Sequence, residues 1–360
     1  MVRISKKVMC GDVPIGGGAP VTIQSMTNTD TRDVKSTVGQ IHRLEEAGCD
    51  IVRCAVPDLE AAAALGQIKK AVKLPLVADI HFDYRLALSA IENGADKVRI
   101  NPGNIGSPDR VRAVLAAARE HRIPVRIGVN SGSLEAKILK KYGGVTAEAL
   151  AESALQTVRQ IEDMDFTDIV VSLKASDVRL NFDAHMIVAD KIGYPLHIGI
   201  TESGTESGGK LKSAIGIGSL LLNGIGDTLR VSLTGDPVSE VLYAKEILKA
   251  AGIRKSGINL ISCPTCGRTK VDLIRITKEI EDKIKPVNEL WEKEGRTPVT
   301  LAVMGCEVNG PGEAKEADIG VACGNGRGLI FRKGKAVQNC AESEVTDLLL
   351  KLLTEITVER

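Results

Sequence analysis

Over the first two thirds of the chain, short aliphatic runs alternate with longer segments that carry apolar residues at helical spacing. This alternation predicts strands joined by helices in a parallel sheet. Arg110–His121 and Ala147–Asp163 are two of the predicted helices. The eight predicted strands are Val21–Met26, Asp50–Val56, Leu76–Ile80, Lys97–Asn101, Val125–Asn130, Asp168–Ala175, Leu196–Glu202 and Thr228–Thr234.

Eight such units within about 235 residues predict a (β/α)8 TIM barrel, a fold that typically takes about 250 residues. The alternative is an open, doubly wound sheet. That fold usually has fewer strands, and the glycine fingerprint of dinucleotide-binding sheets does not follow the first strand here. We therefore expect an α/β protein built on a closed barrel.

Polar residues within these strands recur at every second position. In Lys97–Asn101, for example, Arg99 and Asn101 alternate with Val98 and Ile100. Because successive side chains point to opposite faces of a strand, the apolar set should meet the helices and the polar set should line the barrel. The polar set near the strands' carboxyl ends comprises Asp79, His81, Arg99, Asn101, Arg126, Asn130, Ser172, Lys174, His197, Thr201, Arg230 and Ser232. Barrels of this kind place their active sites at that end.

Five basic residues should meet at this barrel mouth: Arg53, Arg99, Arg126, Lys174 and Arg230. Such a group is costly unless an anion neutralises it. Guanidinium groups suit phosphate oxygens, so the pattern indicates a polyanionic ligand such as a diphosphate. The alternative is that each basic residue pairs with a neighbouring Asp or Glu.

The chain as a whole is nearly neutral, with 47 Lys and Arg against 46 Asp and Glu, so this positive charge is local. Neither nucleic acid nor an anionic membrane is indicated as a partner. The aromatic content of 2% also argues against surfaces that stack bases. The N-terminal residues lack the apolar core of a signal peptide, and no apolar run is long enough to cross a bilayer. We expect a cytoplasmic protein whose eight cysteines are reduced thiols or metal ligands.

Glu202 ends the seventh predicted strand, just before the glycine-rich stretch Ser203–Gly209. A carboxyl group there can give or take a proton. The alternative is a solvated loop carboxylate. The stretch Gly208–Ser213 resembles a phosphate cradle at a helix start, and the alternative is a lid.

The composition changes after Gly252, so we divide the chain into a barrel domain, residues 1–252, and a second domain, residues 253–360. Helical stripes predict Val271–Lys285, which Pro286 interrupts, and Glu344–Val358, with Ser343 as its N-cap. The predicted strands are Ile258–Ile261, Val299–Met304, Ile319–Ala322 and Leu329–Arg332.

Cys263 and Cys266 form a Cys-x-x-Cys pair after one of these strands, and Cys306 follows another. If the two strands are parallel neighbours, their carboxyl ends adjoin and three thiolates can reach one metal or cluster. Glu313, just after the turn Asn309–Gly312, is a candidate oxygen ligand. The alternatives are a structural zinc site, or buried cysteines that bind nothing. A further alternative is that the fourth ligand is Cys323 or Cys340.

Many longer stretches of the sequence are similar to the 4-hydroxy-3-methylbut-2-enyl-diphosphate synthase family, iron–sulfur enzymes of the non-mevalonate isoprenoid pathway. The resemblance covers nearly the whole chain. The stretches that carry it are Gln24–Thr29, Leu74–Tyr84, Arg99–Gly106, Arg126–Asn130, Lys174–Asp177, Gly199–Glu202, Lys212–Gly216, Gly226–Leu233, Cys263–Cys266 and Asn309–Ala314.

The resemblance implies a [4Fe–4S] cluster held by Cys263, Cys266, Cys306 and Glu313. It implies that Glu202 donates a proton and that electrons come from reduced flavodoxin or ferredoxin. The reaction would be the reductive ring opening of 2-C-methyl-D-erythritol 2,4-cyclodiphosphate. The family is homodimeric, with each site shared between one subunit's barrel and its partner's cluster domain. The implied substrate-binding residues are Arg53, Asp79, His81, Arg99, Asn101, Arg126, Asn130, Lys174, Arg230 and Ser232.

Two other functions remain open at this point. One is a non-redox barrel enzyme that acts on a phosphorylated or pterin substrate and carries structural zinc in its small domain. The other is a non-catalytic iron–sulfur scaffold or sensor. Metal analysis separates zinc from iron–sulfur, and substrate loss that depends on a reductant separates an enzyme from a sensor.

Overall fold

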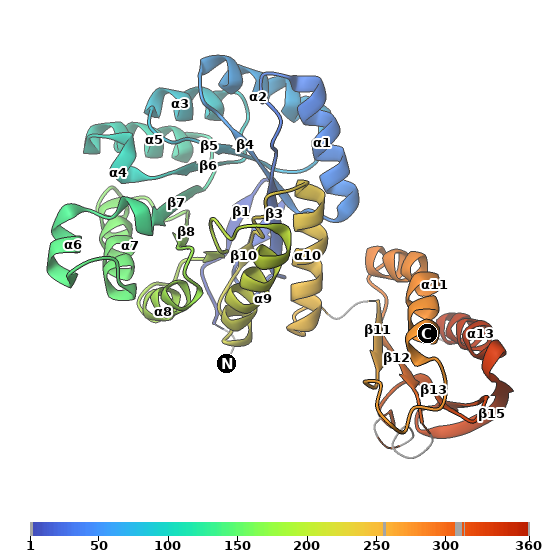
Figure 1. Ribbon diagram of the computed structural model, residues 1–360. Coiled ribbons are helices and arrows are strands. Elements are labelled where there is room, and N and C mark those ends of the chain that lie inside the picture. The colour runs from blue at the N-terminus through green and yellow to red at the C-terminus, as the bar shows by residue number, and fades with distance from the viewer. Residues whose placement is uncertain (1–2, 255–256, 307–311, 313, 359–360) are drawn as a thin grey trace. The chain divides into compact units, whose positions relative to one another are not determined.

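The computed structural model describes residues 3–254, 257–306, 312 and 314–358 (Figure 1). The chain divides into two compact units, Met1–Ile253 and Arg254–Arg360. Each unit has its own hydrophobic core. We describe the two units separately.

The first unit is a parallel barrel, which confirms the predicted fold. Its strands are β3 (Thr22–Met26), β4 (Ile51–Ala55), β5 (Leu76–Asp79), β6 (Lys97–Ile100), β7 (Val125–Asn130), β8 (Ile169–Lys174), β9 (His197–Ile198) and β10 (Thr228–Leu229). The sheet order is β8-β7-β6-β5-β4-β3-β10-β9. A parallel bridge between Val171 and Leu196 joins the two ends, so the sheet closes on itself.

Helices surround the barrel and bury their apolar faces against the strands. Several begin at an aspartate whose side chain accepts a backbone N–H of the first turn, as Asp33, Asp58 and Asp177 do. The helices are α1 (Val34–Ala47), α2 (Leu59–Ala71), α3 (Tyr84–Glu92), α4 (Pro102–Ile105), α5 (Pro108–Glu120), α6 (Ala136–Tyr142), α7 (Ala147–Glu162), α8 (Val178–Ala189), α9 (Glu206–Leu222) and α10 (Pro237–Ala250).

An antiparallel hairpin precedes the barrel and was not predicted. It consists of β1 (Val8–Cys10) and β2 (Val13–Ile15). Its buried side chains form one cluster with Ile51, Val77 and Val170, which lie toward the amino ends of their strands. The hairpin therefore covers the end of the barrel opposite the predicted mouth.

The last two barrel strands are shorter than predicted. Leu196–Glu202 and Thr228–Thr234 pair as strands only at His197–Ile198 and Thr228–Leu229. Beyond them the chain runs very close to its neighbour: a Cβ at Gly199 would lie 2.5 Å from the carbonyl oxygen of Arg230. Glu202 consequently lies in the loop before α9 and does not end a strand.

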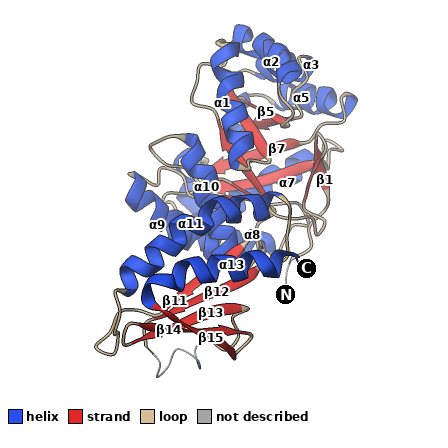
Figure 2. Ribbon diagram, turned by 90° about the vertical axis from the view of Figure 1, so that its right-hand side faces the viewer, coloured by secondary structure: helices blue, strands red, loops and turns tan. Residues whose placement is uncertain are grey.

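As far as its residues are described, the second unit is a five-stranded sheet with two helices against it (Figure 2). Its strands are β11 (Ile258–Ser262), β12 (Val299–Met304), β13 (Ile319–Gly324), β14 (Arg327–Arg332) and β15 (Lys335–Ala341), in that spatial order. The pairs β11–β12 and β12–β13 are parallel, and the others are antiparallel. Helices α11 (Leu273–Lys293) and α13 (Val345–Val358) share one apolar core with the sheet.

Two predictions for this unit were wrong. Pro286 does not interrupt its helix, because α11 continues to Lys293. Ile284 and Trp291, on either side of the proline, are both buried, and this burial offsets the missing backbone hydrogen bond. Ser343 is not the N-cap of the last helix, because it lies within a 3-10 turn, Glu342–Glu344, that precedes α13. Strand β15 was not predicted.

Candidate active site

The interior of the barrel holds a group of buried basic side chains. Arg126 is fully buried, and Arg53 and Arg99 are only 3% and 4% exposed. Arg99 and Arg126 lie opposite each other on the adjacent strands β6 and β7, and Arg53 lies on β4. Burial and the proximity of Arg53 and Arg99 hold the pKa of Arg126 well below its ordinary value. The structure therefore brings these three predicted residues together.

Asp79 is the carboxylate at the centre of this group. Its Oδ1 lies 3.3 Å from Arg99 Nη1, and its Oδ2 lies 3.8 Å from Arg53 Nε. Oδ2 also lies 3.2 Å from His81 Nε2. Burial raises the pKa of Asp79, but Arg53, the His81 hydrogen bond and Arg99 together lower it well below its usual range. Asp79 is therefore ionised at neutral pH and positions two of the arginines.

Arg230 is held by a residue that the sequence did not reveal. Its Nη2 lies 3.3 Å from Oε2 of Glu240, and the backbone N–H of Leu233 donates to the other carboxylate oxygen at 2.8 Å. Glu240 belongs to α10 and is buried. Met26 lies between Arg230 and Arg53, with its sulfur 2.9 Å from Arg53 Nη2. A glutamate on an outer helix carries no strand-parity signal, which is why it was missed.

The acids do not satisfy all the buried donors. Among the described residues, no hydrogen-bond partner is found for any of the three guanidinium nitrogens of Arg126. One guanidinium nitrogen each of Arg53, Arg99 and Arg230 also has no hydrogen-bond partner among the described residues. Because an unpaired buried donor is costly, these atoms indicate that the interior is built for a ligand rich in acceptor oxygens. The alternative that every basic residue pairs with a protein carboxylate does not hold for Arg126.

Gly128 makes room for one of these guanidinium groups. A Cβ on Gly128 would lie 3.0 Å from Arg99 Nε and 3.2 Å from Ser172 Oγ. Lys97, two residues before Arg99 on β6, is a further buried basic residue that sequence reasoning missed. Its position has the same strand parity as Arg99, so the signal was present in the sequence.

The remaining predicted residues lie nearer to solvent. Lys174, Asn130 and Ser232 are half-buried, whereas His81 is exposed. The pKa of Lys174 is well below its ordinary value because of burial and the nearby arginines, Arg53 first among them. Solvent contact limits this effect. Asn101 is buried, and its Nδ2 donates to Ser133 Oγ at 3.3 Å. Together these residues form a polar rim above the arginines.

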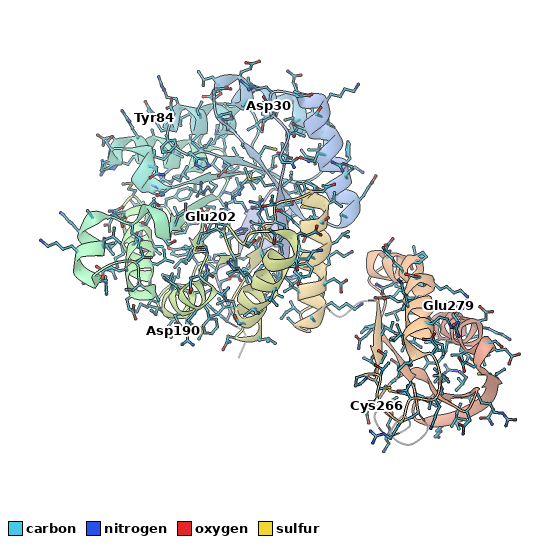
Figure 3. The ribbon with its side chains drawn as sticks, viewed as in Figure 1. Asp30, Tyr84, Asp190, Glu202, Cys266 and Glu279 are labelled. Atoms are coloured by element: carbon cyan, nitrogen blue, oxygen red, sulfur yellow. The ribbon has the colours of Figure 1, made fainter. Side chains whose placement is uncertain are left out.

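Glu202 is exposed in the loop between β9 and α9 (Figure 3). Its φ angle of +50° lies in the left-handed region, which non-glycine residues seldom adopt. Such a conformation persists only where the surroundings impose it, and it is enriched at functional sites. The neighbouring Ser203 is buried and donates from Oγ to the Ser232 carbonyl, which fixes this loop to the barrel.

The cysteines lie at the carboxyl ends of two adjacent strands. β11 and β12 are parallel neighbours, with Ser262 opposite Val303, so Cys263 and Cys306 follow at the same edge of the sheet. The backbone N–H of Gly305 donates to Cys263 Sγ at 3.2 Å. Cys266 is exposed on the loop that follows β11 (Figure 3). A hydrogen bond from the Arg268 backbone lowers the pKa of its thiol.

This donor set suits a metal cluster chemically. The sulfur of Cys263 accepts a backbone N–H, as the sulfurs of cluster-bound cysteines do, and the lowered pKa of Cys266 favours the thiolate form that binds iron. Within the described residues, however, no three Cys, His, Asp or Glu side chains converge closely enough to hold a metal ion. The fourth predicted ligand, Glu313, lies outside the described residues.

Cys323 and Cys340 are less suitable as ligands. Cys323 is fully buried on β13 within the apolar core of the second unit, and burial raises the pKa of its thiol to about 12. Cys340 lies on β15, and burial raises its pKa as well. Both thiols therefore favour the protonated form, which does not bind metal.

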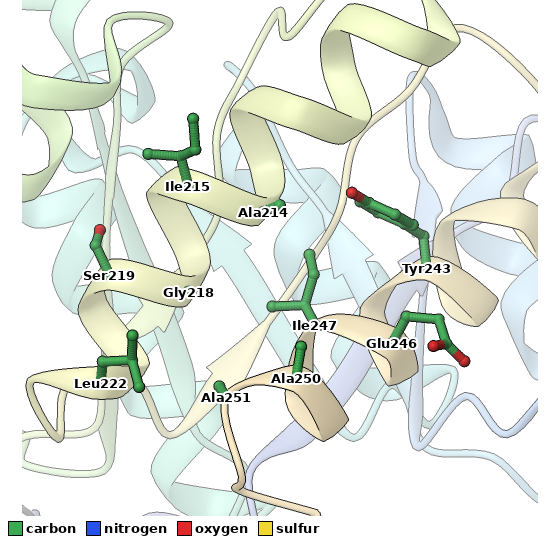
Figure 4. Close-up of a pocket in the computed structure, with 10 residues that line it drawn as sticks. All are labelled: Ala214, Ile215, Gly218, Ser219, Leu222, Tyr243, Glu246, Ile247, Ala250 and Ala251. Carbon is green, nitrogen blue, oxygen red and sulfur yellow. The ribbon is translucent and has the colours of Figure 1, made fainter. Parts of the chain in front are cut away.

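A groove of about 480 Å³ lies elsewhere on the first unit, between α9 and α10 (Figure 4). Its lining is mainly apolar and includes Ile215, Leu222, Ile247 and Ala250. Such a surface lacks the donors that a phosphate requires. None of the described helices is both long and apolar enough to cross a membrane.

Two family models match nearly the whole chain. The GcpE TIM-barrel domain matches residues 5–245, and the GcpE protein C-terminal domain matches residues 259–355. The chain belongs to the GcpE family. This GcpE protein is 55% identical over 359 residues to the 4-hydroxy-3-methylbut-2-en-1-yl diphosphate synthase (flavodoxin) of Caldanaerobacter subterraneus subsp. tengcongensis, covering 100% of this chain and 99% of the relative. The synthase of the same name from Clostridium acetobutylicum is 57% identical over 98% of this chain and 99% of its own length.

Solved structures agree with the fold of the GcpE barrel. Dihydropteroate synthase from Stenotrophomonas maltophilia superposes with a TM-score of 0.50 at 13% identity, covering 68% of this chain and 99% of its own. The Yersinia pestis enzyme gives a TM-score of 0.50 at 10% identity over 68% of this chain and 98% of its own. At such low identity the likeness concerns the barrel fold alone.

Proposed function

We propose that this GcpE protein converts 2-C-methyl-D-erythritol 2,4-cyclodiphosphate into (E)-4-hydroxy-3-methylbut-2-enyl diphosphate, the activity indicated by the names of its relatives. The observation that carries the proposal is the buried Arg126, whose guanidinium nitrogens find no partner among the described residues. A cyclic diphosphate supplies the acceptor oxygens and negative charge that this interior requires.

The barrel holds the diphosphate ring from below and from the sides. Arg126, Arg53 and Arg99 donate to its phosphate oxygens, and Asp79 keeps two of these arginines in place. Lys174, Arg230, Asn101, Asn130, Ser232 and His81 complete the set that we assign to the substrate. Ring opening leaves a phosphate oxygen with additional negative charge, and pre-positioned cations stabilise that charge as it develops.

The overall reaction takes up two electrons and a proton, opens the ring at a carbon–oxygen bond and releases one hydroxyl group as water. Glu202 is the residue that we assign to protonation of the departing hydroxyl. It is exposed on the loop after β9, and its left-handed backbone indicates a constrained position. The electron pair remains on the substrate carbon skeleton as the new double bond forms.

Electrons require a redox centre. We assign Cys263, Cys266 and Cys306 as thiolate ligands of a [4Fe–4S] cluster, with Glu313 as the fourth ligand. When bound, such a cluster passes single electrons to the substrate. A carboxylate ligand is harder and more easily exchanged than a thiolate, so Glu313 would leave one iron accessible. We expect reduced flavodoxin or ferredoxin as the electron donor.

We further propose a cytoplasmic homodimer in which each site combines one subunit's barrel with its partner's cluster unit. The proposal follows from the family resemblance and from the division of the functions between two separate units. Analytical ultracentrifugation of the cluster-loaded protein measures the subunit number directly, and a monomer that retains full activity would exclude shared sites.

Anaerobic reconstitution with iron and sulfide tests the function. The expected result is about four irons per chain, from four ligands, with the absorption of a cluster. The loaded protein should consume the cyclic diphosphate only when a reductant is supplied. A protein that contains zinc in place of iron and turns over without a reductant would support a non-redox barrel enzyme. A stable cluster without any substrate loss would support a scaffold or sensor.

A further inference from the structure

Lys97 is a fully buried lysine beneath the arginines of the barrel. It begins β6 and lies opposite Val77 in the β5–β6 register. Val77 packs against the hairpin residues Val8, Cys10 and Ile15. Lys97 therefore stands between the hairpin that covers one end of the barrel and the Arg126 layer above it. Among the described residues, Nζ of Lys97 has no hydrogen-bond partner.

The groups around Lys97 explain its state. Cys10 faces it from the hairpin, and Arg126 and Arg53 face it from β7 and β4. His197, on β9, also interacts with it electrostatically. Asp96 precedes Lys97 in the chain, but its Oδ2 is already bonded to Lys69 Nζ at 2.6 Å. Burial is the main cause that lowers the pKa of Lys97 to about 8, with Cys10 opposing and the arginines adding to the shift.

We propose that Lys97 is a positioning residue of the anion site, which loses its proton at mildly alkaline pH in the ligand-free protein and takes it up again when the cyclic diphosphate binds. The proposal rests on the function proposed above. Its physical basis is the charge of the barrel interior. Before binding, a charged Lys97 adds one more cation to a buried group that already contains Arg53, Arg99 and Arg126. After binding, two phosphate charges lie above that group and favour a cation below it.

Lysine and arginine differ in this respect. Arginine keeps its proton throughout the accessible pH range, whereas a buried lysine changes state readily. Lys97 can therefore add a positive charge beneath the arginines when the anionic ligand is bound and lose it when the ligand is absent. The protonated Lys97 would repel the guanidinium of Arg126 toward the ligand.

Calorimetric titration with the cyclic diphosphate tests the proposal, in the absence of reductant and in buffers of different ionisation enthalpy. Each phosphate of the ring carries a single, strongly acidic hydroxyl, so the ligand itself does not titrate near neutral pH. At about pH 9 the wild-type protein should take up about one proton more than the Lys97→Met variant. At about pH 6.5 this difference should nearly vanish, because Lys97 is already protonated there.

The affinity for the cyclic diphosphate should depend on pH in the way that proton uptake requires. Proton uptake weakens binding as pH rises, so wild-type affinity should be flat below about pH 8 and fall by up to about tenfold per pH unit above it. Lys97→Met should bind more weakly at pH 7 and should lack this part of the pH dependence. Lys70→Met, an exposed lysine on α2, is the matched control and should behave as the wild type.

Two outcomes would overturn the inference. One is binding without proton uptake at about pH 9 in the wild-type protein, a result that needs no variant to fold. The other is equal uptake by wild type and Lys97→Met, which would assign the proton to another group such as Lys174. Failure of the cyclic diphosphate to bind at any pH would instead count against the proposed function.

Discussion

The side chains assigned to the substrate and those assigned to the cluster differ in burial and in the elements that carry them. In the barrel, Arg126 and Arg99 are buried on β7 and β6, and Asp79 fixes the orientation of Arg99. In the second unit, Cys266 is exposed on a loop and Cys306 is half-buried after β12. The barrel site is therefore formed by folding alone, at the cost of unpaired buried charge. The cysteine site is expected to gain its final geometry from the metal that it binds.

This difference also explains what the sequence could reveal. Strand parity placed Arg99 and Arg126 on one face, because a strand of known direction fixes where each side chain points. The same argument should have included Lys97. It could not find Glu240, whose contact with Arg230 depends on how α10 packs.

Local backbone detail was also beyond the sequence pattern. The aliphatic run around Ile198 is longer than the paired strand. Strand pairing ends at Ile198, and at Gly199 the backbone passes in contact with the carbonyl of Arg230. Pro286 was read as a helix break, but the burial of Ile284 and Trp291 outweighs its local cost. The adjacency of Cys263 and Cys306 was predictable, since it follows from one pair of parallel strands.

Removal of one proposed cluster ligand should have the largest effect, and it should affect the cysteine site without affecting the barrel site. Cys263→Ala should abolish cluster assembly and turnover, because the remaining thiolates cannot hold all the irons. Binding of the cyclic diphosphate to the barrel should remain within about twofold, since burial of Arg126 does not depend on the metal. Iron content and calorimetry measure the two effects. Cys340→Ala is the control and should retain iron. A Cys263→Ala protein with normal iron content would remove Cys263 from the ligand set.

Glu202→Gln tests whether the Glu202 carboxyl group donates a proton in the reaction. Loss of a general acid should lower kcat by about 100- to 10,000-fold, with the affinity for substrate nearly unchanged. Steady-state turnover under anaerobic conditions and equilibrium binding measure the two quantities. Glu206→Gln, one turn further along and paired with Lys210, should keep its activity. An unchanged kcat in Glu202→Gln would leave this carboxylate as an ordinary solvated group.

Arg126→Met should change binding and stability in opposite directions. Affinity for the cyclic diphosphate should fall on the order of 100-fold, because charge-assisted bonds to phosphate are lost. The free energy of unfolding of the ligand-free protein should rise by about 1 to 3 kcal/mol, because a desolvated charge is replaced by an apolar side chain. Calorimetry and urea denaturation measure both. Arg112→Met, exposed on α5, serves as control. A less stable Arg126→Met protein would show that its charge is satisfied within the fold.

Asp79→Asn tests the one carboxylate shared by the two arginines. Its loss should lower the free energy of unfolding at pH 7 by about 3 kcal/mol, because a buried ion pair loses one partner. The pKa of Asp79 is lowered in the fold, so its contribution is present at neutral pH and is lost as pH falls below about 4. Denaturation curves at pH 7 and pH 3 should therefore show a large and then a smaller difference between variant and wild type. An equal difference at both values would contradict this role.

Glu240→Gln should have the smallest effect. The amide oxygen can still accept from the Leu233 N–H, but the charge that holds Arg230 is lost. Affinity for the cyclic diphosphate should fall by about tenfold. Glu246→Gln, exposed on the same helix, is the matched control. If the two variants bind equally well, Arg230 does not need its carboxylate partner.

A crystal structure of the protein with the cyclic diphosphate tests the central claim most directly. The account predicts phosphate oxygens about 2.8 Å from the guanidinium nitrogens of Arg126, inside the barrel. It would be contradicted by a ligand bound outside the barrel while Arg126 remains without an acceptor.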